Sequence, residues 1–67
     1  MGDELVATYI YGTKKIHIYG CWDEESTAHF DYYDVYDEGG HCLNLGDQFY
    51  KMPTRKDCEY YAKQLVG

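Results

Sequence analysis

The sequence predicts an α+β fold: a four-stranded antiparallel meander sheet with one C-terminal helix packed on one face (β-β-β-β-α). Three segments rich in β-branched and aromatic residues predict strands, and a turn with two glycines after the third predicts a short fourth strand. The last segment instead has the apolar spacing of a helix. The 67 residues contain no repeat, linker or low-complexity stretch, so we expect a single small domain spanning 1–67.

The first two predicted strands form a hairpin. Residues 5–11 and 15–22 are both rich in β-formers, and only a short polar connection separates them. Gly12 stands at the first position of a two-residue loop, which suits a type II′ turn. Gly20, inside the second strand, indicates a bulge or the end of that strand.

A second hairpin follows a polar loop at residues 23–27. We expect the third strand at 29–37, a turn at 38–40 with two glycines, and a short fourth strand at 41–45. Residues 49–50 are candidates for one further brief pairing.

The C-terminal segment carries the clearest local signal. Thr54 is a good N-cap, and Asp57 three residues later suits the positive end of a helix, although it is shorter than the Glu or Gln of a full capping box. Glu59 and Lys63 stand four residues apart, a spacing at which opposite charges on a helix form a weakly stabilising pair. One apolar face is predicted, formed by Cys58, Tyr61, Ala62 and Leu65.

The net charge of −6 is unevenly distributed along the chain. Residues 16–50 contain eight acids and no Lys or Arg, whereas residues 51–67 carry a surplus of two positive charges. An acidic surface repels nucleic acid and anionic membranes and favours basic partners. We therefore expect no direct nucleic-acid binding and no membrane binding.

The third strand mixes aromatic and acidic residues, so its two faces must be assigned. Val35 is its one aliphatic residue and favours burial together with Tyr33. Burial of an ionised Asp34 without a partner would be costly. A bulge near Phe30 is an alternative that would turn that ring inward. The predicted exposed face therefore carries Tyr32, Asp34, Tyr36 and Glu38.

The cysteines and histidines do not have the spacing of a compact metal site. Cys21, Cys42 and Cys58 are an odd number, and we expect reduced thiols; one disulfide with a spare thiol would need an oxidising compartment. No zinc-type spacing is present, and we predict no metal and no cofactor. A site assembled across strands remains an alternative, with His17, Cys21, His29 and His41 as its candidates.

Catalysis finds little support in the sequence. Adjacent residues of a strand point to opposite faces, so His41 and Cys42 could not act on each other directly. One sheet and one helix also leave little depth for an enclosing pocket. We expect no enzymatic activity. The opening residues are acidic and resemble no signal peptide, so the expected compartment is the cytoplasm.

The leading functional hypothesis is a binding protein that docks an acidic, tyrosine-rich sheet face on a basic protein, such as one that binds nucleic acid, and inhibits it. Carboxylates on a rigid sheet can imitate phosphates, and tyrosines supply anchoring contacts. The predicted partner-binding residues are Tyr32, Asp34, Tyr36 and Glu38, with Asp23, Glu24 and Glu25 as steering charges.

Two alternatives stay open: a small structural or homo-oligomerising domain, such as a homodimer, and a small metal-binding protein. In its size, acidity and β-rich composition, the chain resembles the accessory and inhibitor proteins of phages and mobile elements, anti-CRISPR proteins among them. That likeness is to a class of proteins and implies an inhibitory role; it assigns no residue.

Overall fold

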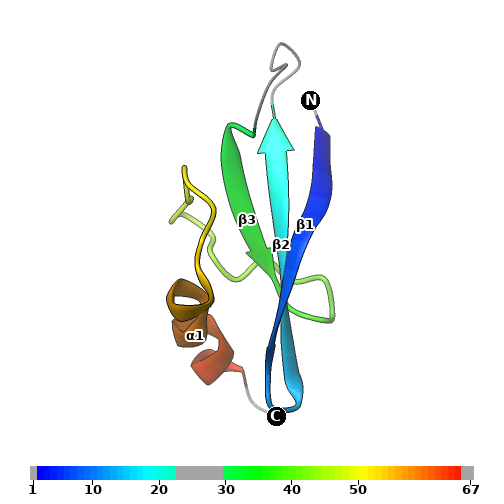
Figure 1. Ribbon diagram of the computed structural model, residues 1–67, viewed down its shortest axis with the longest axis vertical. Coiled ribbons are helices and arrows are strands. Elements are labelled where there is room, and N and C mark those ends of the chain that lie inside the picture. The colour runs from blue at the N-terminus through cyan, green and yellow to red at the C-terminus, as the bar shows by residue number, and fades with distance from the viewer. Residues whose placement is uncertain (1, 23–29, 66–67) are drawn as a thin grey trace.

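The computed structural model describes residues 2–22 and 30–65. Its elements are β1 (Gly2–Tyr11), β2 (Lys14–Trp22), β3 (Tyr32–Tyr36) and α1 (Arg55–Gln64). The strands form one antiparallel sheet in the order β1-β2-β3, and α1 lies beside one face of it (Figure 1). The predicted α+β fold with a C-terminal helix is confirmed, but the prediction of four strands is wrong because the sheet has three.

The first hairpin forms as predicted. A type II′ turn needs a positive φ at the first of its two central residues and not at the second. Gly12 has a φ of 67°, whereas the φ of Thr13 is not positive. The irregularity that the sequence indicated at Gly20 lies instead in β1, between Leu5 and Ala7. Gly20 stays in the ladder, and its missing side chain leaves room for Phe30, whose ring would lie 2.5 Å from a Cβ at that position.

The predicted fourth strand, residues 41–45, forms only a single bridge. Cys42 pairs with Tyr36, and the Leu43 N–H donates to the Val35 carbonyl at 2.7 Å, but the ladder ends there. The expected further pairing at residues 49–50 is reduced to one bridge, between Phe49 and Tyr33.

Asn44 explains why the backbone ladder stops. Its side chain is buried, and its Oδ1 accepts from the Val35 N–H at 3.0 Å. Its Nδ2 donates to the carbonyls of Tyr33 and Asp47, each at 3.3 Å. An amide side chain has the same donor and acceptor groups as a peptide bond. Asn44 therefore satisfies the edge of β3 as a fourth strand would.

The core lies between the sheet and α1. The apolar helix face predicted from the sequence is buried, except that Leu65 lies just beyond the end of the helix and is only partly buried. The fully or nearly buried core residues are Ile16, Ile18, Val35, Cys58, Tyr61 and Ala62.

The N-terminus of α1 is capped more completely than the sequence suggested. The Thr54 hydroxyl accepts from the Asp57 N–H at 3.1 Å, and the Asp57 carboxylate accepts from the Thr54 N–H at 2.9 Å. The aspartate therefore closes a full capping box despite its short side chain. The predicted pair of Glu59 and Lys63 also forms, at 3.4 Å.

Both ends of α1 are tied to the first hairpin. At its start, the Tyr11 hydroxyl donates to the Arg55 carbonyl, and the Arg55 guanidinium lies 4.6 Å from the centre of the Tyr11 ring. At its end, Lys14 Nζ donates to the carbonyls of Leu65 at 2.6 Å and Ala62 at 3.4 Å. A cation at this position stabilises the negative end of the helix dipole. These contacts fix which face of the sheet the helix covers.

Candidate protein-binding face

In the described part of the chain no helix packs on the sheet face opposite α1, and we call this face the outer face. Val35 and Tyr33 pack into the core on the other side, so the predicted orientation of β3 is confirmed. Residues paired across strands project from the same face. The pairing therefore places on the outer face Asp3, Leu5, Thr8 and Ile10 of β1, Lys15, His17, Tyr19 and Cys21 of β2, and Tyr32, Asp34 and Tyr36 of β3.

Phe30 takes the inward position that the sequence left as an alternative. Its ring packs on Gly20 and lies 5.8 Å from that of Tyr33 and 5.9 Å from that of Trp22. Tyr32 and Asp34 nevertheless keep their places on the outer face, opposite Cys21 and Tyr19.

Two tyrosine rings form the centre of the outer face. Tyr19 and Tyr36 meet edge to face, with ring centroids 5.3 Å apart and an interplanar angle of 76°. Burial, followed by the charge of Asp34, raises the pKa of the Tyr36 hydroxyl. Tyr36 therefore stays neutral at physiological pH and offers a hydroxyl group together with an apolar ring.

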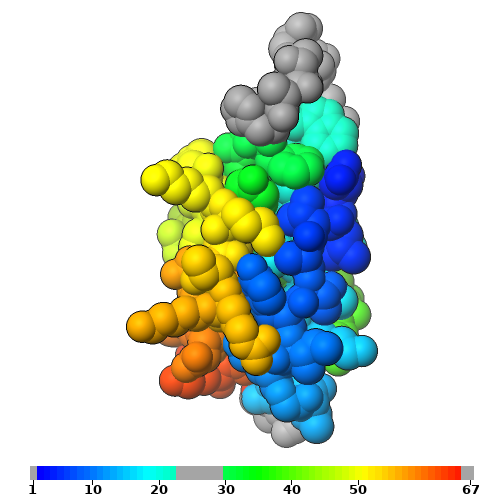
Figure 2. All heavy atoms as spheres, in the orientation of Figure 1, coloured from blue at the N-terminus to red at the C-terminus, as the bar shows by residue number. Residues whose placement is uncertain are grey.

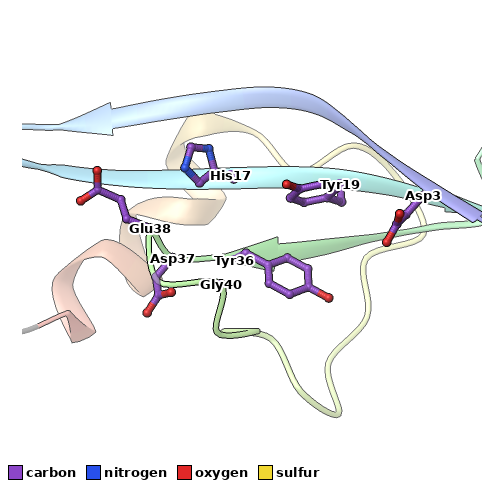
Figure 3. A pocket seen from close by; sticks show the side chains of 7 residues that line it. All are labelled: Asp3, His17, Tyr19, Tyr36, Asp37, Glu38 and Gly40. Atoms are coloured by element: carbon purple, nitrogen blue, oxygen red, sulfur yellow. The ribbon is translucent and has the colours of Figure 1, made fainter.

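A hollow of about 450 Å³ lies over these rings. In Figure 3, the carboxylate of Asp3 lies beyond the tyrosines at one end, and those of Asp37 and Glu38 lie at the other. Carboxylates thus flank an aromatic centre. The hollow is lined by Asp3, His17, Tyr19, Tyr36, Asp37, Glu38 and Gly40.

Asp37 is held in place by the turn that follows β3. Its carboxylate accepts from the His41 backbone N–H at 2.9 Å and lies 3.3 Å from the His41 imidazole. The backbone hydrogen bond from His41 is the main cause that lowers the pKa of Asp37. The carboxylate therefore remains ionised at neutral pH.

Asp34 is supported by a thiol from the neighbouring strand. Cys21 Sγ lies 3.6 Å from Asp34 Oδ2 and is almost fully buried. Burial, followed by the charge of Asp34, raises the pKa of Cys21 to about 11. This thiol is therefore neutral and can donate to the carboxylate. All three cysteines are free in this structure.

Three of the positive charges near α1 are engaged away from the outer face. Lys14 caps the end of the helix, Arg55 lies on Tyr11, and Lys63 pairs with Glu59. Lys15 does project from the outer face, at the hairpin end of β2. The steering acids predicted at 23–25 lie outside the described residues, as do the loop at 23–27 and His29.

The structure brings together some of the predicted residues and adds others. Tyr36 and Glu38 line the hollow, whereas Tyr32 and Asp34 lie farther along β3 on the same face. Sequence reasoning missed Asp3, His17, Tyr19 and Asp37 as lining residues. The period-two alternation of the second strand already placed His17 and Tyr19 on one side, but their neighbours in β3 depend on the strand register.

Within residues 2–22 and 30–65, no three His, Cys, Asp or Glu side chains gather into a group that could hold a metal ion. No helix in the described part of the chain is long and apolar enough to cross a membrane. No protein-family model matches this chain, and no curated protein or solved structure matches it either.

Proposed function

We propose that this protein is a non-enzymatic binding module that docks its outer face on a basic protein and thereby inhibits it. The observation that supports this best is the tyrosine pair of the outer face, flanked by the carboxylates of Asp3, Asp37 and Glu38. A protein that binds nucleic acid through a basic channel is the partner class that such a face fits, because spaced carboxylates can occupy phosphate positions.

The two kinds of side chain have different roles in this proposal. Tyr19 and Tyr36 are already held against each other, so little side-chain entropy is lost when they are buried by a partner. Tyrosine is among the residues that dominate binding energy at interfaces. The carboxylates mainly accelerate the encounter with a basic surface, and this effect weakens with salt.

The chemistry of the two buried thiols supports a non-enzymatic role. A cysteine nucleophile needs a lowered pKa, whereas burial raises the pKa of both Cys21 and Cys58 to about 11. Neither group is poised for attack at neutral pH.

The outer face is also poorly suited to stack on a second copy of itself. Such stacking would bring together two faces that each carry the carboxylates of Asp3, Asp34 and Asp37, and like charges repel. The charge pattern therefore favours a different, basic protein as the occupant of this face.

Capture from a lysate of the source cells, followed by identification and binding measurements with the purified captured protein, tests this proposal. We expect the immobilised protein to capture a basic protein at low salt, and heparin to compete because it carries a dense negative charge. Tyr36→Ala should abolish capture. Tyr60→Ala is the matched control, because Tyr60 is 63% exposed on α1 and lies away from the outer face.

Equal capture by the two tyrosine variants would argue against docking through the outer face. Capture that neither salt nor heparin weakens would argue against a basic binding surface on the partner.

A further inference from the structure

We propose that two copies of this chain pair antiparallel through the outer edges of β1 to form a continuous six-stranded sheet. This inference goes beyond the proposed function, because it concerns an edge of the sheet and a second copy of the chain instead of the outer face and a foreign protein.

The two edges of the sheet differ in how far their backbone groups are hydrogen-bonded. The edge of β3 is closed by backbone and side-chain hydrogen bonds from residues 42–49, including those of Asn44 and Phe49. Among the described residues, no strand or bridge pairs with the other edge, which is formed by the ten residues of β1. Figure 2 looks onto β1, whose blue side chains lie at the surface beside the orange helix. A long unpaired edge is a template for another strand.

The register shows which backbone groups of β1 point outward. Tyr11 and Lys14 flank the two-residue turn and form a hydrogen-bonded pair, so alternation directs the N–H and C=O groups of Thr8 and Ile10 away from β2. The side chain of Arg55 supports this assignment, because it donates to the Ile10 carbonyl at 2.6 Å from outside the sheet. Beyond the bulge, Leu5 resumes the outward pattern.

The apolar residues of this edge match each other under a two-fold axis. Antiparallel pairing with Thr8 at the axis places Leu5 opposite Ile10 of the second copy, and Ile10 opposite Leu5. These two side chains are 50% and 52% exposed, and both project from the outer face. Pairing would cover each with an apolar neighbour, as directly opposed residues of a sheet do.

The charges of this edge are complementary in the same register. Glu4 comes opposite Tyr11 of the second copy, whose ring carries the guanidinium of Arg55. The two-fold axis repeats this carboxylate–guanidinium contact on its other side. Arg55 can turn from the Ile10 carbonyl to the carboxylate, and the carbonyl then accepts from the Leu5 N–H of the second copy.

The bulge at residues 5–7 does not prevent this pairing. Val6 and Ala7 both pack against the core, so the extra residue is absorbed on the inner face. Leu5 and Thr8 consequently remain on the outer face on either side of the bulge. A bulge also shortens the flat part of an edge, which restricts the strands that can add to it. A second copy of β1 satisfies this restriction, because its own bulge is related to the first bulge by the two-fold axis.

Sedimentation and light scattering across a dilution series of the full chain test the proposal. We expect the wild type to reach twice the 7.9 kDa mass of one chain. Thr8→Pro should be monomeric, because it removes the outward N–H at the axis without touching the backbone bonds to β2; the side-chain bond from Thr8 to His17 is lost in this variant and in Thr8→Val alike. Thr8→Val is the matched control: it keeps the N–H and should remain dimeric. Circular dichroism checks that both variants fold.

A charge exchange keeps the test decisive if Thr8→Pro does not fold. Glu4→Arg should weaken the dimer about tenfold, and the double variant Glu4→Arg with Arg55→Glu should restore it. Lys56→Glu makes a charge change on an exposed part of α1 and should leave the dimer intact.

Three results would overturn the proposal. The first is a wild-type chain that stays monomeric throughout the series. The second is a folded Thr8→Pro variant that remains a dimer. The third is a dimer that Tyr36→Ala abolishes and Glu4→Arg does not, since this would place the contact on the outer face.

Discussion

Replacing Asn44 with alanine tests whether one side chain closes the edge of β3 in place of a fourth strand. The substitution removes the acceptor of the Val35 N–H and a donor to the Tyr33 carbonyl, both on the central part of β3. Val35 is fully buried, so its N–H would have no ready replacement by water. The Leu43 bond to the Val35 carbonyl remains and keeps the loop near the strand.

The expected loss is large for so small a protein. A buried backbone group left without a partner costs roughly 1–3 kcal/mol, so the substitution should cost about 2–4 kcal/mol after partial relaxation. The whole free energy of unfolding of a chain of this length is about 3–10 kcal/mol. We therefore expect the Asn44→Ala variant to lose a major fraction of its stability.

Urea unfolding followed by circular dichroism measures this loss. With a slope of about 1 kcal/mol per M for a small domain, the midpoint should fall by at least about 2 M. Hydrogen exchange gives a local readout, because the Val35 amide should lose its protection. Gln48→Ala removes an exposed amide from the same loop and should leave the midpoint almost unchanged.

A midpoint shift equivalent to less than about 0.5 kcal/mol for Asn44→Ala would refute this account of the edge, since that is the size of an ordinary surface effect. A Val35 amide that stays protected in the variant would refute it as well, because another acceptor must then have replaced Asn44.

Three further predictions concern packing, the helix end and pH. Gly20→Ala should lower the unfolding free energy by about 1–3 kcal/mol, because the new methyl group would displace the ring of Phe30, and urea unfolding measures this change. Lys14→Met should cost about 1–2 kcal/mol in the same assay, because the end of α1 loses its charged donor. Stability should be constant near neutral pH and fall as pH rises from about 9 to about 11, because the folded state holds the thiol protons of Cys21 and Cys58 more tightly; urea midpoints across this range measure it.

Matched variants make these results specific. Gly39→Ala also adds a methyl group, but the closest atom belongs to the exposed side chain of His41, so its effect should be small. Lys15→Met removes a neighbouring charge that does not cap the helix and should change little. Equal losses for either pair would contradict the reasoning. For the pH series, the Cys21→Ser and Cys58→Ser variants should each show a shallower fall above pH 9, and an unchanged fall would contradict the assignment to these thiols.

The features that could be predicted from sequence depend on local signals. The first hairpin follows from Gly12 in a two-residue loop between β-rich segments, and the start of α1 follows from Thr54 and Asp57. The fourth strand was predicted because residues 41–45 follow a glycine turn directly after the third strand, as the second half of a hairpin does. Nothing in that pattern reveals that the Asn44 side chain replaces the backbone, because such replacement depends on the three-dimensional position of β3.

The outer face shows the same division between local and non-local information. Alternation along one strand sufficed to separate Tyr32, Asp34 and Tyr36 from Val35. Alternation could not show that Asp3 lines the hollow. The bulge in β1 shifts the register with β2 by one residue, so the alternation of faces reverses across the bulge. The sequence indicated a bulge at Gly20, where the glycine instead makes room for a ring.

The proposed dimer has a consequence for the proposed function. Pairing through β1 keeps the two outer faces on the same side of one sheet, so a dimer would present two tyrosine pairs to its surroundings. A basic protein that is itself dimeric, or that has two equivalent grooves, would then be held twice, and the second contact would form at high effective concentration. Thr8→Pro should weaken binding to such a partner without altering the tyrosine pair, whereas Tyr36→Ala should abolish binding and leave the dimer intact. Because the two variants act on different surfaces, each proposal can fail while the other stands.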